Sequence, residues 1–261
     1  MLTSSDRWRR IAEVNPPELP DMGHVHLEGA WEDVLVTDNV FGKLRVSPYA
    51  FAARITHDVS SVHPTVVVST RDRNILAIES EVRGALGNGV DSFFVVVGDT
   101  VPHVDHLANH LEIVAHLRDL QETLPSFEVG MPTRFQEKQF RRRIDLGAQF
   151  FLAGPVLDPA TVAPSAERLG IRDDDPPVYL MVIPPFSPGW VERMETIGVV
   201  PVTDGFRQGI GDAPEDARRE RAWAWSLEVE AEAKEAGFAG VVLMGLSRDT
   251  LTGEAAERWR G

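Results

Sequence analysis

One stretch of the sequence, residues 66–99, constrains the fold more than any other part of the chain. Residues 66–68 are three consecutive valines, as in a strand that is buried on both faces. After a polar turn, apolar residues recur at the spacing of one helix face, and residues 87–89 (Gly-Asn-Gly) end that helix. A second apolar run, residues 93–97, is followed by Gly-Asp. Two buried strands joined by a helix predict a parallel strand–helix–strand unit.

The same alternation continues along the whole chain, with no hairpin signal between neighbouring strands. Eight segments read as strands: residues 11–14, 34–36, 66–68, 93–97, 127–130, 149–153, 178–183 and 240–246. The helices between them are predicted at about residues 47–57, 75–86, 104–120, 135–146 and 161–169, with two or three more within 187–237. Eight such units in 261 residues predict one α/β domain over residues 1–261, a single (β/α)8 TIM barrel. An open doubly wound sheet is the rival fold, but no G-x-G-x-x-G follows the first strand.

Composition excludes several classes of function. The chain has 40 acidic and 26 basic residues, a net charge of −14, which argues against broad nucleic-acid binding. It has no cysteine, hence no disulfide, thiolate metal site or thiol nucleophile. No apolar run approaches the roughly 20 residues of a membrane helix, and the first residues lack the apolar core of a signal peptide. A cytoplasmic enzyme is therefore expected.

Polar residues gather where the predicted strands end, and in a barrel these ends converge on one face. The strand-end residues are Glu13, Thr37, Asp38, Asn39, Thr70, Arg71, Asp72, Arg73, Asp99, Asp158, Ser247, Arg248 and Asp249. Glu13 stands out because apolar residues and two prolines surround it, and such burial can raise the pKa of an acid toward neutrality. The alternatives are that Glu13 is a salt-bridged or capping acid and that Asp99 is a helix N-cap.

Three other clusters are open to more than one interpretation. His24 and His26 have the H-x-H pattern of barrel metal hydrolases, but histidines at later strand ends are missing, so no metal site is predicted. The run of arginines at residues 141–143, with Lys138, reads either as a phosphate site or as a solvated helix face. His103, His106 and His110 share one face of a predicted helix and read as a solvated face.

Several of these motifs occur together in one known family. They are E-V-N-P-P at residues 13–17, V-T-D-N at 36–39, T-R-D-R-N at 70–74, G-D at 98–99, R-I-D-L-G-A at 143–148 and the segment 240–248. In this order they resemble the methylenetetrahydrofolate reductase family over most of the chain. The resemblance implies reduction of 5,10-methylenetetrahydrofolate to 5-methyltetrahydrofolate, with NADH or NADPH as hydride donor and FAD as cofactor.

The resemblance also implies a role for each matching residue. Glu13 is the general acid, and Asp99 positions the pterin or tunes the flavin. The residues implied in cofactor binding are Thr37, Asp38, Asn39, Arg73, Gly98, Asp99 and Arg143. The residues implied in substrate binding are Glu13, Asp99, Gly154 and Asp158.

The sequence also departs from the family pattern. Gly154 stands where the family has a folate-binding glutamine, and residues 64–68 lack the histidine that helps to hold flavin. Residues 129–133 lack the aromatic residue and the acid of the family. Two further hypotheses follow: a reductase without flavin, or a barrel without reductase activity that binds folate or a partner protein in a methyl-transfer system. A homo-oligomer or a methyltransferase partner is compatible with either.

Overall fold

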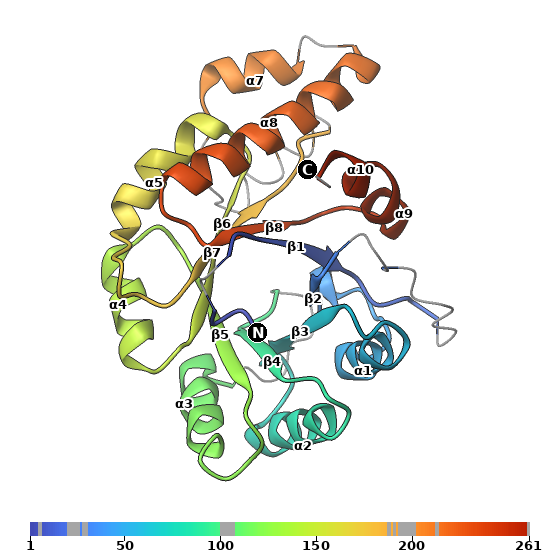
Figure 1. The fold of residues 1–261 in the computed structure, drawn as a ribbon, viewed down its shortest axis with the longest axis vertical. Helices are drawn as coiled ribbons and strands as arrows, with labels where there is room; N and C mark the ends of the chain where they lie inside the picture. The colour runs from blue at the N-terminus through green and yellow to red at the C-terminus, as the bar shows by residue number, and fades with distance from the viewer. Residues whose placement is uncertain are drawn as a thin grey trace.

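A computed structural model shows a closed barrel of eight parallel strands in the order β1 to β8, with helices between them on the outside (Figure 1). It describes residues 1–4, 7–19, 27, 31–99, 108–186, 189, 192, 202–211 and 214–259. Each strand pairs in parallel with its sequence neighbours, and β8 closes the ring on β1. The predicted (β/α)8 TIM barrel is therefore confirmed.

The bounds of the predicted elements agree with the observed ones to within a few residues, except at one helix, and the short helices within residues 248–258 were not predicted. The strands are β1 (Arg9–Val14), β2 (Asp33–Val36), β3 (His63–Ser69), β4 (Ser92–Val96), β5 (Glu128–Thr133), β6 (Phe150–Val156), β7 (Val178–Val182) and β8 (Gly240–Leu243). The α-helices are α1 (Pro48–Asp58), α2 (Ile75–Leu86), α3 (His110–Leu120), α4 (Glu137–Asp145), α5 (Val162–Leu169), α7 (Asp204–Gly211), α8 (Glu215–Glu235), α9 (Arg248–Thr250) and α10 (Ala256–Arg258). Short turns of other helix types are η1 (Val40–Gly42), η2 (Pro159–Thr161) and η3 (Leu251–Ala255).

The exception is α3, which was predicted to begin at about residue 104 and begins at His110. The side chain of Asn109 accepts a hydrogen bond from the backbone N–H of Leu111 at 3.1 Å and so caps the first turn. Residues 100–107, and with them His103 and His106, lie outside the described residues. His24 and His26, the residues considered as a metal pair, also lie outside the described residues.

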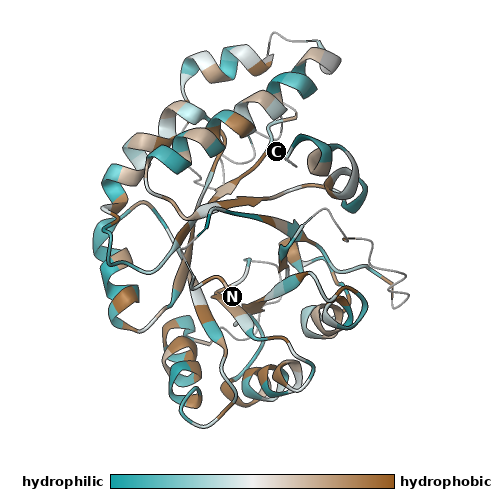
Figure 2. Ribbon diagram, viewed as in Figure 1, coloured by the Kyte–Doolittle hydropathy of each residue, from teal (hydrophilic) through white to brown (hydrophobic). Residues whose placement is uncertain are grey.

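The helices pack their apolar faces on the outer surface of the barrel. Figure 2 shows hydrophobic residues along the strands and on the helix faces turned toward them, with hydrophilic residues mostly on the outer faces. A large buried cluster joins the outward-facing strand residues, such as Val34, Val66 and Val129, to helix residues such as Phe51 and Ile78. Within the described ranges, no helix has the length and apolar character needed to cross a membrane.

Inside the barrel, every second residue of each strand points toward the axis, because side chains alternate across a strand. On β1 these inward residues are Arg9, Ile11 and Glu13, in order from the amino-terminal to the carboxyl-terminal end. Ile11 belongs to a second buried cluster that fills the middle of the barrel, together with Leu2, Leu35, Val67, Phe94, Phe150, Leu152, Tyr179 and Val242. This apolar layer separates a polar amino-terminal end from a polar carboxyl-terminal end.

The amino-terminal end of the barrel is closed by the first residues of the chain, which lie inside the ring of strands in Figure 1. The Leu2 side chain is buried, and its backbone N–H donates to Glu128 Oε1 at 2.5 Å. The Thr3 N–H donates to the other oxygen of Glu128 at 2.9 Å, and Tyr179 donates to the Leu2 carbonyl at 2.7 Å. Ser92 also donates to Glu128, at 2.7 Å. Glu128 is thereby satisfied although it is only 1% exposed.

We expect Leu2→Ala to destabilise the fold by about 2–5 kcal/mol, since it removes a buried side chain from the middle layer and leaves a cavity. The measurement is urea denaturation followed by tryptophan fluorescence. Leu44→Ala is the control, because Leu44 is 83% exposed and its loss should change stability by no more than about 0.5 kcal/mol. Equal denaturation midpoints for the two variants would show that the buried Leu2 side chain does not stabilise the barrel.

Candidate active site at the carboxyl-terminal end of the barrel

A cavity of about 600 Å³ opens at the carboxyl-terminal end of the barrel and is called the mouth cavity below. Its floor is the upper side of the apolar middle layer and includes Leu35, Val67, Phe94, Met181 and Met244. Its rim carries polar side chains from the ends of β1, β2, β4 and β5 and from α3 and α4. Barrel enzymes carry their chemistry at this end, so the mouth cavity is the candidate active site.

Glu13 is the inward-facing residue at the top of β1, and only 8% of it is exposed. Its Oε1 accepts a hydrogen bond of 3.2 Å from the backbone N–H of Gly245, which follows β8. Burial raises the pKa of Glu13 from 4.5 to about 7; the Gly245 hydrogen bond lowers it and the nearby charge of Asp99 raises it further. Glu13 is therefore a carboxyl group that can give or take a proton near neutral pH.

Asp99 lies beyond the end of β4 on the rim of the mouth cavity. Its Oδ2 accepts a hydrogen bond of 2.5 Å from the backbone N–H of Phe41, and its carbonyl accepts one of 2.9 Å from Arg71. Gly98 makes this turn possible: its φ is +88°, and a Cβ atom there would lie 2.3 Å from Ser69 Oγ. Asp99 does not cap α3, the next helix among the described residues, because that helix begins at His110 and its N-cap is Asn109.

Asp38 is the centre of a polar network that ties the ends of β2 and β3 together. Its carboxylate pairs with Arg73 and accepts hydrogen bonds from the Asn39 amide at 3.0 Å and from the Ser69 N–H at 3.3 Å. Arg73 also pairs with Glu81 of α2 at 3.2 Å. The Thr37 hydroxyl donates to Asn15 at 2.8 Å. Thr37 and Asp38 line the mouth cavity, whereas Arg73 and Asn39 do not.

The arginines of α4 divide between two roles. Arg141 pairs with Asp175 and also donates to the carbonyl of Gly170, so it fastens α4 to the segment before β7. Arg143 lines the mouth cavity, and its Nη1 donates to the carbonyl of Pro132 at 2.6 Å. Arg143 also carries a lowered pKa, which burial and the neighbouring Arg134 and Arg142 cause.

Two of the predicted substrate residues lie away from the mouth cavity. Asp158 is buried and caps η2, where it accepts the Ala160 N–H at 3.0 Å. Its second oxygen accepts hydrogen bonds from the Thr203 N–H at 2.8 Å and from the Thr203 hydroxyl at 2.6 Å. Both carboxylate oxygens are therefore engaged in hydrogen bonds that stabilise the fold. Gly154 lies in an irregular part of β6 with a φ of +112°, and its position is not on the cavity wall. The structure thus brings together Glu13, Thr37, Asp38, Gly98, Asp99 and Arg143, but not Gly154 or Asp158.

The residues predicted to hold FAD do not form one surface that fits its diphosphate. Of the two arginines implied in cofactor binding, Arg73 is held by Asp38 and Glu81 outside the cavity, whereas Arg143 lines it. The Asn39 side chain is also engaged, since its oxygen accepts the Arg45 N–H at 2.8 Å. FAD binding stays a prediction, and no step of the chemistry below depends on it.

Sequence reasoning missed the apolar floor and one side of the rim. Phe94, Met181 and Met244 lie within the predicted strands. Because side chains alternate across a strand, counting every second residue would have assigned them to the barrel interior. His110 was interpreted as part of a solvated face, yet it is half-buried and lines the cavity. Arg134 directly follows β5 and was not singled out, although strand-end position was the signal used elsewhere.

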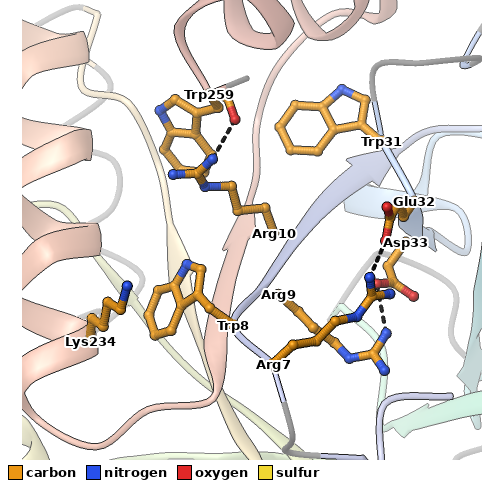
Figure 3. A pocket seen from close by; sticks show the side chains of 9 residues that line it. All are labelled: Arg7, Trp8, Arg9, Arg10, Trp31, Glu32, Asp33, Lys234 and Trp259. Atoms are coloured by element: carbon orange, nitrogen blue, oxygen red, sulfur yellow. Dashed lines mark hydrogen bonds and ion pairs between the residues drawn. The ribbon is translucent and has the colours of Figure 1, made fainter. Parts of the chain in front are cut away.

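A second cavity, of about 400 Å³, lies at the opposite end of the barrel (Figure 3). Figure 3 shows Trp8 and Lys234 on one side of it, and Trp31 with Glu32 and Asp33 on the other. Its arginines already have acidic partners, namely Arg7 with Glu32 at 2.6 Å, Arg9 with Asp33 at 2.9 Å and Arg10 with Glu230 at 2.6 Å. Because these arginines are already neutralised, this end of the barrel is suited to a structural role. We therefore place the chemistry at the mouth cavity.

Comparison with solved structures finds barrels of the same architecture. A protein from Clostridium thermocellum described as binding two copies of 5-methyl-5,6,7,8-tetrahydrofolic acid has a TM-score of 0.62 and 10% identity, over 97% of this chain and 96% of that one. A 2,3-dimethylmalate lyase of the PEP mutase/isocitrate lyase superfamily has a TM-score of 0.58 and 14% identity, over 99% and 81%. An oxaloacetate acetylhydrolase has a TM-score of 0.55 and 12% identity, over 91% and 75%. At these identities the likeness shows the fold.

These comparisons correct the functional prediction. No protein-family model matches the chain, and no curated protein matches its sequence. The enzymes among these neighbours are a lyase and an acetylhydrolase, not NAD(P)H oxidoreductases. The predicted methylenetetrahydrofolate reductase activity is therefore contradicted, and the resemblance holds only as far as a TIM barrel with a folate-binding structural neighbour.

Titration of Glu13 should make stability fall as pH rises. Because the folded-state pKa of about 7 exceeds the ordinary 4.5, the folded protein holds this proton more tightly than the unfolded chain does. The stabilisation is complete below pH 4.5 and is lost as pH rises to about 7, and it amounts to about 3 kcal/mol at about 1.4 kcal/mol per pKa unit. We expect Glu13→Gln to remove this loss, so that the variant gains stability relative to wild type between pH 5 and pH 8. Urea denaturation at both pH values measures it, and parallel curves for the two proteins would rule out a raised pKa.

Proposed function

We propose that the protein binds a reduced folate in the mouth cavity and acts in one-carbon or methyl-group transfer, without a reductase activity of its own. The observation that carries this proposal is the composition of the cavity: two carboxyl groups, Glu13 and Asp99, on the rim above an apolar floor that includes Phe94. The solved structure described as binding 5-methyltetrahydrofolic acid, which matches nearly the whole chain in fold, supports the choice of ligand.

The chemistry of a reduced pterin suits this arrangement. One edge of the ring carries N–H donors, which a carboxylate such as that of Asp99 accepts with charge-assisted hydrogen bonds. The faces of the ring are apolar and can pack on Phe94, Val67 and Met181. Volumes of about 300–1,000 Å³ are usual for small-molecule sites, and the mouth cavity falls within this range.

Glu13 supplies proton transfer at such a site. Its Oε1 accepts the Gly245 N–H, which leaves Oε2 for a hydrogen bond to a ligand. With a pKa of about 7, the group is protonated in part of the molecules at neutral pH and can donate to a ring nitrogen. When a methyl group leaves a nitrogen, the nitrogen keeps the electron pair, and a proton placed there stabilises the product. Glu13 is therefore the acid in the proposed methyl transfer, with the acceptor supplied by a partner.

We expect Asp99→Asn to weaken the binding of 5-methyltetrahydrofolate by about ten- to a hundred-fold, the usual effect of losing a hydrogen bond to a charged group. Isothermal titration calorimetry at pH 7 measures it. Asp249→Asn is the control: Asp249 is exposed, as Asp99 is, but it lies in α9 beyond β8 and does not line the cavity.

Two results would contradict the proposal. The first is the absence of any binding of 5-methyltetrahydrofolate to the wild-type protein. The second is consumption of NADH or NADPH by the wild-type protein when 5,10-methylenetetrahydrofolate is added, since this would restore a reductase activity.

A further inference from the structure

Three basic side chains form one side of the mouth cavity, and they are called the basic corner below. They are Arg134, directly after β5, Arg143 of α4, and His110 at the start of α3. Among the described residues, no carboxylate forms an ion pair with Arg134 or Arg143. In a chain with 40 acidic and 26 basic residues, cavity-lining arginines that form no ion pair within the described part of the chain are unexpected.

The basic corner is electrostatically unfavourable as it stands. Arg143 is half-buried, and burial together with Arg134 and Arg142 lowers its pKa. Burial and the charge of Arg143 likewise lower the pKa of His110. A partly desolvated cation beside further cations costs stability unless an anion joins it. Such uncompensated charge in a cleft is typical of a ligand site.

Other arginines of the chain show that it usually neutralises buried cations. Arg73 at the same end of the barrel pairs with Asp38, and Arg9 at the other end pairs with Asp33. On α4 itself, Arg141 lies two residues before Arg143 and pairs with Asp175. Arg143 is half-buried as well, yet it forms no ion pair with any described residue, and so it departs from this pattern.

The positions of the strands set the basic corner apart from Glu13. In the closed order β1 to β8, β5 is four strands from β1 in either direction, so the two strand ends face each other across the mouth. Glu13 ends β1, whereas Arg134 follows β5 and Arg143 bonds to Pro132 of β5. Glu13 and the basic corner therefore lie on opposite sides of the apolar floor. Asp99 follows β4, next to β5, and its carboxylate accepts the Phe41 N–H from the segment after β2.

We propose that Arg134 and Arg143 bind the carboxylate tail of the ligand while its heterocyclic ring lies toward Glu13 and Asp99. The inference rests on the proposed function, because a reduced folate carries both parts: a pterin ring with N–H donors and a glutamate tail with carboxylates. Guanidinium groups bind carboxylates through paired hydrogen bonds, and Gln139 on the same side of the cavity offers an amide donor. The basic corner then selects ligands that carry a tail.

The test compares two ligands by calorimetry: 5-methyltetrahydrofolate and 6-methyltetrahydropterin, which has the reduced ring but no tail. We expect Arg143→Gln and Arg134→Gln each to weaken the binding of the folate by roughly ten- to a hundred-fold, as for loss of a charge-assisted hydrogen bond, and to leave the affinity for the pterin unchanged. Lys138→Gln is the matched control, because Lys138 is an exposed cation of α4 that does not line the cavity. Arg134 is exposed, so its replacement keeps the test valid if Arg143→Gln does not fold.

The outcomes separate this inference from the proposed function. If folate and pterin bind the wild-type protein equally, and neither arginine variant changes the folate affinity, the carboxylate site is overturned and the proposed function stands. If neither ligand binds the wild-type protein, both fail. Inorganic phosphate that displaces the folate as effectively as p-aminobenzoylglutamate would also overturn the assignment to a carboxylate tail.

Discussion

The apolar middle layer of the barrel is the constraint on which both ends of the molecule depend. It exists because inward positions recur every second residue along each strand, and those at mid-strand, such as Ile11, Val67 and Phe94, are apolar. Below it, the buried carboxylate of Glu128 accepts hydrogen bonds from the backbone N–H groups of Leu2 and Thr3. Above it, the same layer removes water from Glu13 and raises the pKa of that side chain to about 7. One packing arrangement therefore stabilises the fold and prepares an acid for neutral pH.

The mouth cavity combines groups that a protein would not place together for stability alone. A buried acid that is easily protonated lies on one side, and on the other lie two arginines that form no ion pair with the described residues. Local costs of this kind are concentrated at functional sites, where a ligand offsets them. The arrangement matches a ligand with hydrogen-bond donors at one end, an apolar middle and an anion at the other, which is the chemical outline of a reduced folate.

The motifs that resemble methylenetetrahydrofolate reductase have structural explanations in this barrel, and this is why they overstated the activity. Gly98 is required because a side chain there would collide with Ser69, whatever reaction the cavity supports. Asp38 and Arg73 bind each other and fasten the ends of neighbouring strands. Such residues identify strand ends that meet at a mouth. They do not specify a hydride donor or a cofactor.

Most of the fold was predictable from the sequence, because buried parallel strands and amphipathic helices have distinct local patterns. The eight strands and their order were predicted, as was the position of Glu13 and Asp99 at strand ends. The local sequence pattern could not predict which hydrogen-bond partner each polar side chain would have. Asp158 reads as a strand-end acid like Asp99, yet its oxygens are engaged by Thr203, 45 residues later in the chain. His110 reads as a surface residue, yet it is half-buried and lines the cavity.

The most direct test of this account is a crystal structure of the protein grown with 5-methyltetrahydrofolate. The account predicts the pterin ring in the mouth cavity against Glu13 and Asp99, with the glutamate carboxylates at Arg134 and Arg143. A ligand bound instead between Trp8 and Trp31 at the opposite end of the barrel, with an empty mouth cavity, would contradict the account.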